Sequence, residues 1–464
     1  MTMLEARSTA TIADPTDLPV VVIGAGPVGL AAAAHLLERG LEPLVLEQGD
    51  RPGAAVTEWG HTRLFSPWQH VVDAAAVRLL VAEGWEPQHP EAMPTGNDLV
   101  RHYLAPLAAT EALRDRIRTG VRVDGVSRQG MDRTRSAGRE SAPFALRITD
   151  ATGSSEILAR AVIDASGTFS NPNQVLASGF RPIQSDAIAS HIVRGLPDVL
   201  GGQRHEFAGR HTVVVGAGHS AANTLIALGR LAEREPGTTI TWIIRSESPV
   251  RVYGAETDEL AARASIGSAT HELVRTGQVA LLDQFLIGDV EPTDGDRVVI
   301  RGTRHGEPAT VEADTVVVAT GFRPDLDMLR EIRLSLDEIV EAPRALAPLI
   351  DPNLHSCGTV PPHGVVELAH PEPDFYIAGM KSYGRAPTFL LLTGYEQVRS
   401  IAAELAGDHT AAREVHLVLP ETGVCSTDLG GASCCAAPSA TGATGATKPI
   451  VNLLAADTSG SCCS

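Results

Sequence analysis

The sequence predicts an α/β fold in which one strand–turn–helix–strand unit occurs twice along the chain. The first unit begins with the apolar strand Val20–Ile23, followed by a glycine-rich turn at residues 24–29 and an alanine- and leucine-rich helix. The same order restarts at residues 211–221. Both units end on an apolar strand and a small-residue turn, at residues 162–167 and 315–321. Two nested α/β domains explain this repetition better than one.

The first unit continues through a helix that Gly40 stops and a short strand at residues 42–47. Between residues 94 and 120, apolar residues recur at near-helical spacing and predict a helix. Residues 144–148 and 157–164 flank a turn-rich segment and predict a hairpin.

The second unit follows its glycine turn with a helix to about residue 235 and a strand at residues 239–244. A proline-rich region then leads to a last buried strand at residues 374–379 and a helix that begins near Pro387. The expected segments are a flexible N-terminus (1–18), a first domain in two parts (19–200 and 324–415), an inserted second domain (201–323) and a flexible, cysteine-containing tail (416–464).

The first glycine turn has the residues that a dinucleotide-binding site requires. Gly24 permits the tight turn, Gly26 lets backbone amides approach a pyrophosphate, and Gly29 allows the helix to pack closely on the strand. Pro27 suits the first turn of the helix, whose N-terminus stabilises phosphate. Glu47, at the end of the second strand, is placed to accept hydrogen bonds from an adenosine ribose, so we expect FAD here. The alternative is a tight turn that binds no ligand.

The second glycine turn differs from the first at two positions. Ala221 replaces the third glycine and is still small, and the second strand ends in Arg245 where the first ends in an acid. A guanidinium at this position pairs with a 2′-phosphate, which predicts NADPH in preference to NADH. The alternative is a solvated arginine at a strand end. Two Rossmann-like domains imply a hydride relay, and the residues expected at NADPH are Gly216, Gly218, His219, Ser220, Ala221 and Arg245.

The closing segment at residues 379–390 lies where a terminal helix would direct its N-terminus at a flavin. The free amides of Thr388, Phe389 and Leu390 would stabilise negative charge on the reduced flavin. Lys381 and Arg385 would add positive charge there and are catalytic candidates. The alternative is that both cations lie exposed in a loop.

Several features together resemble class B flavin-dependent monooxygenases and their thioredoxin-reductase-like relatives. They are the two glycine turns, the turn at residues 166–173, the linker at residues 319–324 and the closing strand before Gly379. The resemblance covers about residues 18–405. Within this group, residues 357–364 and 380–389 and the cysteine-bearing tail look most like the flavoprotein monooxygenases of bacterial arsenic-resistance operons (the ArsO type).

The resemblance implies that NADPH reduces FAD and that O₂ then oxygenates a soft nucleophile such as sulfur, nitrogen or trivalent arsenic. This chain departs from the group twice. The family's Phe-x-Gly-x-x-x-His fingerprint is not intact between Phe180 and His191. Where many members carry a Thr-Asn pair, this chain has Ser66, a third catalytic candidate expected to face the flavin ring. Trp59 and Trp68 would form walls there, or else are ordinary core aromatics. The remaining residues expected at the cofactors are Gly53, Trp59, Arg63, Gly167, Thr320, Gly321 and Gly379.

Five of the six cysteines lie at the C-terminal end of the chain. Soft thiolates bind metalloids, so Cys425, Cys434 and Cys435 are expected to gather around one trivalent arsenic. A redox tail and an incidental thiol-bearing tail are the alternatives. The redox route needs a disulfide beside the flavin, and the body has no Cys-x-x-Cys or Cys-x₄-Cys motif. Cys357 lies near histidines, but their irregular spacing argues against a metal site.

Charge and hydropathy limit the other classes of protein to which this chain could belong. A formal net charge of −18 opposes binding to nucleic acid, and no apolar stretch approaches the roughly 20 residues of a membrane span. The N-terminus has no apolar signal core, so a cytoplasmic location is expected. The expected partners are a small-molecule substrate and O₂; the oligomeric state is left open, with a homodimer as one option. The alternative functions are a flavin-dependent reductase or oxidase that passes electrons to a thiol or metalloid, and a thiol metalloid-binding protein.

Overall fold

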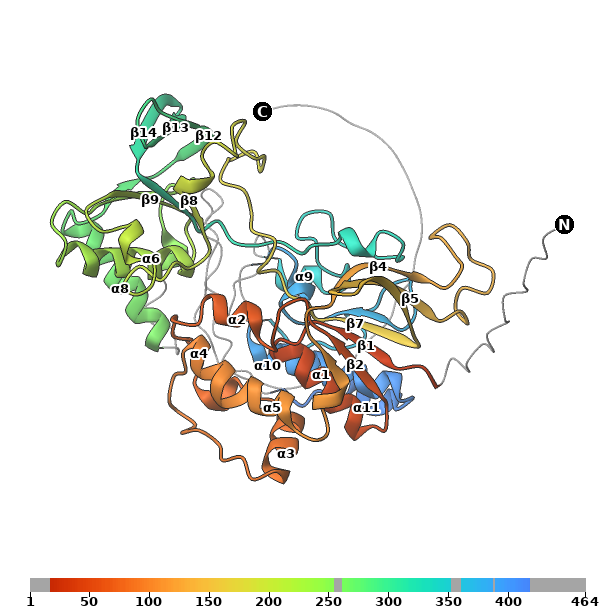
Figure 1. Cartoon of the computed structure of the whole chain (residues 1–464). Helices are drawn as coiled ribbons and strands as arrows, with labels where there is room; N and C mark the ends of the chain where they lie inside the picture. Colours follow the sequence, from red (N-terminus) through yellow and green to blue (C-terminus); the bar gives the residue numbers. More distant parts are fainter. Residues whose placement is uncertain (1–16, 254–260, 352–359, 387–388, 418–464) are drawn as a thin grey trace, which may run out of the picture. The chain divides into compact units, whose positions relative to one another are not determined.

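The computed structural model describes residues 17–253, 261–351, 360–386 and 389–417 (Figure 1). The first parallel sheet has the order β16-β7-β1-β2-β3. Its strands are β1 (Val20–Ile23), β2 (Pro43–Leu46), β3 (Ile117–Arg118), β7 (Ala161–Asp164) and β16 (Phe375–Ile377). All neighbouring strands are parallel, and Val20 lies opposite Pro43 on one side and Ala161 on the other. All four residues of β1 are buried, since packed elements cover both faces of the sheet.

Helices cover one face of the first sheet, with α1 and α10 on that side in Figure 1. Alanines at residues 31–34 make the buried side of α1 narrow enough to pack closely. The helices of this layer are α1 (Pro27–Glu38), α2 (Ala54–Glu58), α3 (Ala74–Ala82), α4 (Gly96–Leu99), the π-helix η3 (Val100–Leu104), α5 (Ala105–Ala109), α9 (Ala347–Ile350), α10 (Leu391–Leu405) and α11 (His409–Arg413). Short 3₁₀ turns complete the unit: η2 (Trp68–His70), η4 (Arg114–Arg116), η7 (Asp327–Leu329) and η8 (Gly379–Tyr383).

An antiparallel sheet of β4 (Arg122–Arg128), β5 (Phe144–Asp150) and β6 (Gly153–Ala159) covers the other face. The predicted hairpin is therefore β5–β6, but it does not extend to residue 164. At Arg160 the chain leaves the antiparallel sheet, and β7 joins the parallel one. The continuous apolar run hides this change of partner.

A second parallel sheet repeats the plan in the order β11-β10-β9-β15-β8. Its strands are β8 (Ile192–Arg194), β9 (His211–Val215), β10 (Thr239–Ile243), β11 (Ala280–Leu282) and β15 (Thr315–Val318). The helices α6 (His219–Ala232), α7 (Val250–Tyr253) and α8 (Ala261–Arg275) accompany it, with η5 (Ala189–His191) and η6 (Arg204–Glu206) in its loops. Its antiparallel sheet comprises β12 (Phe285–Pro292), β13 (Val298–Arg304) and β14 (Glu307–Ala313). The predicted boundary at residue 201 falls after β8, the first strand of this sheet.

Two predicted helices are shorter than expected. The segment from residue 94 to 120 contains only short pieces, because a π-helical turn and Thr110, whose ψ of 149° is not helical, interrupt the α-helical pattern. The last long helix, α10, begins at Leu391 and not near Pro387, because Leu390 has extended backbone angles (φ −108°, ψ 140°). No described helix is long and apolar enough to cross a membrane.

The chain passes between the two parallel sheets twice, and the two linkers are bonded to each other. The N–H of Asn173 donates to the carbonyl oxygen of Gly321 at 3.0 Å, and its side-chain amide donates to that of Thr320 at 3.1 Å. The Thr320 hydroxyl returns a bond to the Asn173 carbonyl at 3.1 Å. The rings of Phe169 and Phe322 stack with centroids 5.1 Å apart. Thr320 and Gly321, predicted at the cofactors, thus hold the linkers together.

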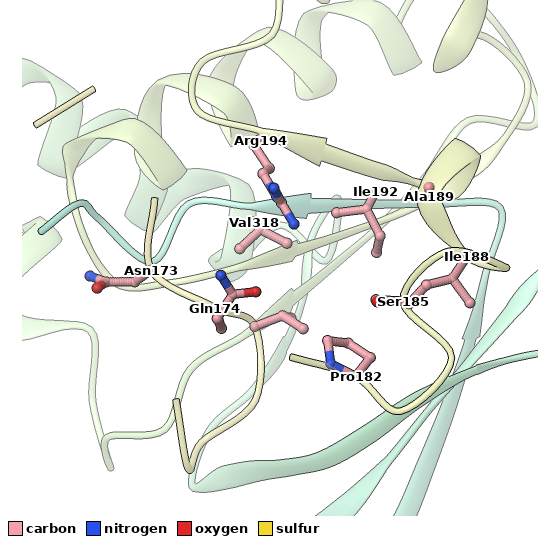
Figure 2. A pocket seen from close by; sticks show the side chains of 10 residues that line it. Asn173, Gln174, Pro182, Ser185, Ile188, Ala189, Ile192, Arg194 and Val318 are labelled. Atoms are coloured by element: carbon pink, nitrogen blue, oxygen red, sulfur yellow. The ribbon is translucent and has the colours of Figure 1, made fainter. Parts of the chain in front are cut away.

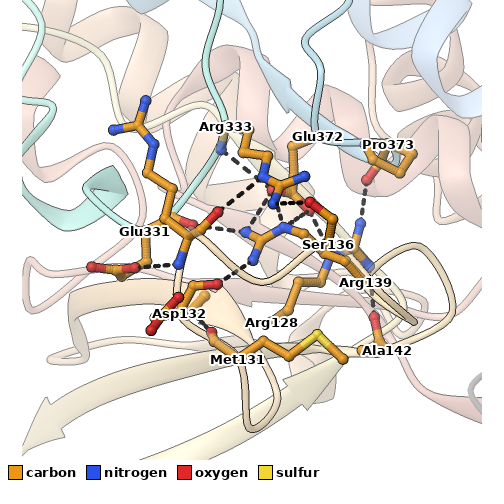
Figure 3. A network of polar contacts seen from close by, with 12 residues as sticks. Arg128, Met131, Asp132, Ser136, Arg139, Ala142, Glu331, Arg333, Glu372 and Pro373 are labelled. Atoms are coloured by element: carbon orange, nitrogen blue, oxygen red, sulfur yellow. Dashed lines mark hydrogen bonds and ion pairs between the residues drawn. The ribbon is translucent and has the colours of Figure 1, made fainter.

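A buried ionic cluster joins the antiparallel sheet of the first unit to the returning chain (Figure 3). The carboxylate of Glu372, fully buried, pairs with the guanidinium groups of Arg128 at 2.8 Å and Arg139 at 2.7 Å. Arg128 also donates to the carbonyl oxygen of Ala142 and stacks over the Phe144 ring at 3.7 Å. These bonds fix the segment that leads into β16.

Candidate functional site

The first glycine turn is packed so tightly that neither of its end glycines can carry a side chain. Gly24 has a φ of +101°, and a Cβ on it would lie 2.8 Å from the carbonyl oxygen of Ala165 at the end of β7. A Cβ on Gly29 would lie 1.9 Å from the carbonyl oxygen of Gly24. The turn therefore brings α1 directly against β1.

The middle of the same turn is open. A Cβ on Gly26 would meet no atom within 4 Å. Gly26 is also the N-cap of α1, which has Pro27 in its first turn and no side-chain cap. Since the first N–H groups of a helix lack partners within the helix, this end can bind phosphate. The space and the donors fit a dinucleotide pyrophosphate.

Glu47 joins this turn to the segment that follows β2. One of its carboxylate oxygens accepts a hydrogen bond from the N–H of Ala25, and the other from the N–H of Gly49, both at 2.7 Å. The N–H of Gly53, which has a φ of +71°, donates to the Ala25 carbonyl at 3.0 Å. Glu47 is thus fixed beside the turn, and each oxygen keeps a lone pair for a ribose hydroxyl.

Lys381 is buried at the carboxyl end of the first sheet, so the alternative of an exposed loop cation is wrong for this residue. Its Nζ lies 2.6 Å from a carboxylate oxygen of Asp164 on β7, and both side chains are at most 1% exposed. Nζ also donates to the Ser166 hydroxyl at 3.0 Å, and that hydroxyl donates to Asp164 at 2.6 Å. A buried cation requires such a partner. Asp164, a lone acid in an apolar strand, was the signal that sequence reasoning missed.

The rest of the closing segment departs from the prediction. Because α10 begins at Leu391, Phe389 precedes the helix, where it is half-buried and packs edge-on against the Tyr383 ring at 5.1 Å. Arg385 is exposed. Thr388 lies outside the described residues. The N-terminus of α10 itself lacks a side-chain cap, so the helix end still offers donors.

A buried polar network fixes the backbone of this segment. Gly379 has a φ of +70°, and its N–H donates to the side-chain oxygen of Gln397 on α10 at 2.7 Å. The Gln397 amide nitrogen lies 2.9 Å from both the Ser382 hydroxyl and Nε2 of His363. Burial lowers the pKa of His363, which keeps the ring neutral and able to accept. Glutamine in a helix is most often exposed to solvent, so this network could not be predicted from residue type.

The predicted wall of the flavin site is divided between core and surface. Trp68 is buried in the core on the helix side of the sheet, in agreement with the alternative that it is an ordinary core aromatic. Trp59 is half-buried, and a Cβ on Gly96 would lie 2.8 Å from its indole. Ser66 is half-buried in the same loop.

Two other residues predicted at the cofactor shape loops. Arg63 is exposed, pairs with Thr95 in an isolated antiparallel bridge, and donates from its guanidinium to the Met93 carbonyl. Gly167 has a φ of +70°, which favours glycine, in the turn that follows Asp164.

The second glycine turn has the same geometry as the first. Gly216 has a φ of +132°, and its Cβ would lie 2.2 Å from the carbonyl oxygen of Ala319. A Cβ on Gly218 would meet nothing within 4 Å, and α6 begins there without a side-chain cap. Ala221 is fully buried. The indole N–H of Trp242 donates to the Gly216 carbonyl at 2.7 Å, a support for the turn that sequence reasoning missed.

The other residues predicted at the second turn lie at the start of α6 and the end of β10. The His219 ring lies 5.1 Å from the ring of Phe65, and Ser220 is half-buried in the first turn of α6. Arg245 is exposed two residues after β10 ends. This position suits a group that pairs with a phosphate outside the protein interior.

The cysteines predicted to bind a metalloid, Cys425, Cys434 and Cys435, lie outside the described residues, as does Cys357. Within the described ranges, no cluster of three or more His, Cys, Asp or Glu side chains could hold a metal ion.

Comparison with known proteins gives one matching family. The sequence model of the family described as pyridine nucleotide-disulphide oxidoreductase matches residues 21–343. Among curated proteins, no match was found.

Solved structures share the fold at low sequence identity. The bacillithiol disulfide reductase of Bacillus cereus is 20% identical, with a TM-score of 0.61, covering 84% of this chain and 99% of that chain. The FAD-bound cadaverine monooxygenase of Erwinia amylovora is 15% identical, with a TM-score of 0.59, covering 87% and 98%. A mutant flavin monooxygenase from Stenotrophomonas maltophilia is 23% identical, with a TM-score of 0.56, covering 84% and 98%. These likenesses confirm the predicted fold of two Rossmann-like domains.

Proposed function

Because the chain belongs to the pyridine nucleotide-disulphide oxidoreductase family, we propose that it is an NADPH-dependent FAD monooxygenase acting on a small, soft nucleophile. At the level of the family it is a flavin-dependent oxidoreductase. The family also confirms the prediction of a flavin and a pyridine nucleotide as cofactors. The preference for NADPH over NADH, which rests on Arg245, belongs to the proposal.

The observation that carries the proposal is the position of the cysteines. The first cysteine in the chain is Cys357, so both glycine turns and both parallel sheets up to β15 contain none. A disulfide reductase of this architecture needs a redox-active sulfur beside the flavin. Its absence from residues 1–356 favours O₂ as the electron acceptor.

The residues present fit both cofactors. Gly26 and Gly218 leave open space at two uncapped helix N-termini, and Glu47 and Arg245 stand at the ends of the adjacent strands. When bound, FAD would accept hydride from NADPH and activate O₂, so that one NADPH, one proton and one O₂ would give one oxygenated product, one NADP⁺ and one water.

The chain's own residues hold the turns of the site and bind the cofactor and the substrate. Glu47 holds the first turn and binds ribose, and the buried Lys381–Asp164 pair holds the Ser166 turn at the carboxyl ends of β7 and β16. We assign Lys381 as a positioning residue. Arg385, exposed in the closing segment, and Ser66 are proposed to meet the substrate.

A trivalent arsenic species is the substrate that we favour. The support is the resemblance of residues 357–364 and 380–389 to the arsenic-resistance flavoproteins and the five thiols after residue 424. Thiolates are soft ligands that bind metalloids, so Cys425, Cys434 and Cys435 are proposed to collect the substrate.

The test is product analysis under ¹⁸O₂. Flavin-loaded protein with NADPH and methylarsenite is expected to form a pentavalent product carrying one ¹⁸O for each NADPH consumed. Substrate-dependent oxidation of NADPH without air would indicate a reductase, and hydrogen peroxide as the only product an oxidase. Either result would refute the monooxygenase proposal.

A truncated chain tests the tail separately. Deleting all residues after Leu419 is expected to weaken arsenite binding while leaving the flavin content unchanged. Equal arsenite affinity in the truncated and full-length proteins would remove the tail from the proposal.

A further inference from the structure

We propose that the second unit carries a binding site for a short-chain aliphatic carboxylate, apart from both glycine turns. A cavity of about 310 Å³ lies between β8, the end of β15 and the loop of residues 173–189 (Figure 2). This volume is at the lower end of the range for small-molecule sites.

The cavity lies on the opposite face of the second sheet from α6. Ile192 and Val318 line it. Val318 belongs to the core cluster on that face, together with Val213 and Val215, and Ile192 packs against this cluster. Val214 and Val317, whose side chains alternate to the other face, pack with α6. The glycine turn begins α6, so this cavity is not the nucleotide site.

Three polar side chains from the loop of residues 173–189 and from β8 converge on the cavity. They are Gln174 and Ser185 in that loop and the exposed Arg194 at the end of β8, and Figure 2 shows their ends directed into the space. Within the described part of the chain, none of the three side chains has a hydrogen-bond or ion-pair partner. A guanidinium, an amide and a hydroxyl can all donate to one acceptor group.

These donors suit an anion whose acceptors are oxygen atoms. Every residue that lines the cavity is neutral except Arg194. A guanidinium binds a carboxylate through two parallel N–H bonds, which matches a carboxylate better than a spherical anion. The chain's net charge of −18 opposes nonspecific anion binding, so the affinity must come from this local geometry.

The remaining wall selects an aliphatic body. Val175, Pro182 and Ile188 face the same space, and all three are buried. Apolar walls and a cavity of this volume suit a chain of about four to six carbons. Butyrate and hexanoate therefore represent the ligand class.

Calorimetric titration of the flavin-loaded protein at constant ionic strength tests the site. Hexanoate is expected to bind saturably and more tightly than butyrate or acetate, by about three- to fourfold for each added methylene. Inorganic phosphate, which has no apolar body to contact the wall, is expected to bind more weakly than hexanoate. No saturable carboxylate binding, or phosphate binding as tight as hexanoate, would overturn the proposal.

Two arginine variants separate the site from general charge effects. Arg194→Met is expected to weaken hexanoate binding about tenfold or more. Arg210→Met makes the same charge change at the opposite, amino-terminal edge of the same sheet, before β9, and is expected to bind as the wild type does. Equal affinity in the wild type and Arg194→Met would refute the assignment of Arg194.

A third variant tests the cavity without changing charge. Ala189→Trp places a large ring on the cavity lining, at an exposed position where it does not disturb the core, and is expected to block hexanoate. Flavin content and the midpoint of urea unfolding, measured for each variant, identify any loss that is due to misfolding. Undiminished hexanoate binding in a folded Ala189→Trp protein would place the ligand elsewhere and refute the proposal.

Discussion

Single atoms decide what each glycine of the first turn does. Gly24 and Gly29 are required by the protein's own packing, because an added Cβ on either meets a backbone oxygen. Gly26 meets nothing within the protein, so only a ligand can require it to be glycine. The two kinds of glycine, indistinguishable in the sequence motif, therefore predict different mutant behaviour.

Gly26→Ala is expected to fold with wild-type stability, since its φ of −78° suits alanine, but to bind FAD at least about tenfold more weakly. Gly29→Ala is expected to lower the free energy of unfolding, by about 3 kcal/mol or more, because of the 1.9 Å contact. Flavin titration of apoprotein and urea unfolding measure the two effects. Loss of stability in Gly26→Ala would show that the space over the turn is not open.

The proposed preference for NADPH over NADH depends on Arg245. Arg245→Ser is expected to raise KM for NADPH by about 10- to 100-fold and to leave KM for NADH unchanged, because only NADPH has the 2′-phosphate. Steady-state flavin reduction with both nucleotides measures this. Equal KM changes for the two nucleotides would mean that the arginine is simply solvated.

The ion pair of Lys381 and Asp164 is expected to affect stability because each buried charge neutralises the other. Lys381→Met leaves the fully buried Asp164 without its cation and should cost about 3–5 kcal/mol of stability. Combining it with Asp164→Asn removes the uncompensated charge, so the double variant should be more stable than Lys381→Met alone. Additive losses would show that the two side chains act independently.

At the scale of elements, the sequence predicted what depends on local pattern. The glycine turns, their strands and their helices were identified correctly, because the 3.6-residue and two-residue periods lie within each segment. The point at which the chain changes from one sheet to another was missed. Nothing local separates β6 from β7 around Arg160, where the chain exchanges an antiparallel partner for a parallel one. Partners distant in sequence decide such breaks, as they also decide the burial of Lys381 and Gln397.

The cluster around Glu372 holds β4 and β5 to the returning chain. We expect the negative charge of Glu372 to determine how much this cluster stabilises the fold. Glu372→Gln leaves the buried Arg128 and Arg139 without a carboxylate and should cost about 3–5 kcal/mol of stability. Glu156→Gln breaks the exposed pair with Arg147 and should change stability by less than about 1 kcal/mol. Urea unfolding compares the two, and equal losses would contradict this account.

At the scale of the whole molecule, buried histidines make stability depend on pH. Burial lowers the pKa of His370 to about 4, against 6.5 in the unfolded chain. Stability from the neutral ring is therefore complete above pH 6.5 and is lost as the pH falls toward 4. From pH 7.5 to 5 the loss from this residue is about 2 kcal/mol.

His370→Gln is expected to reduce the fall in unfolding free energy between pH 7.5 and 5 by that amount, because glutamine does not titrate. His89→Gln, the same substitution at an exposed position, is the matched control for the change of side chain itself. Identical pH profiles for His370→Gln and the wild type would show that His370 titrates normally.

The bonded linkers also bear on how such a molecule can change over evolution. Residues 174–319 leave and rejoin the first domain at Asn173 and Thr320, neighbours that are already hydrogen-bonded. A segment whose two ends meet can be lengthened, exchanged or replaced as a cassette while the host sheet keeps its strand order. Because Arg245 lies within that segment, the nucleotide preference that we propose for it could be inherited separately from the proposed flavin site.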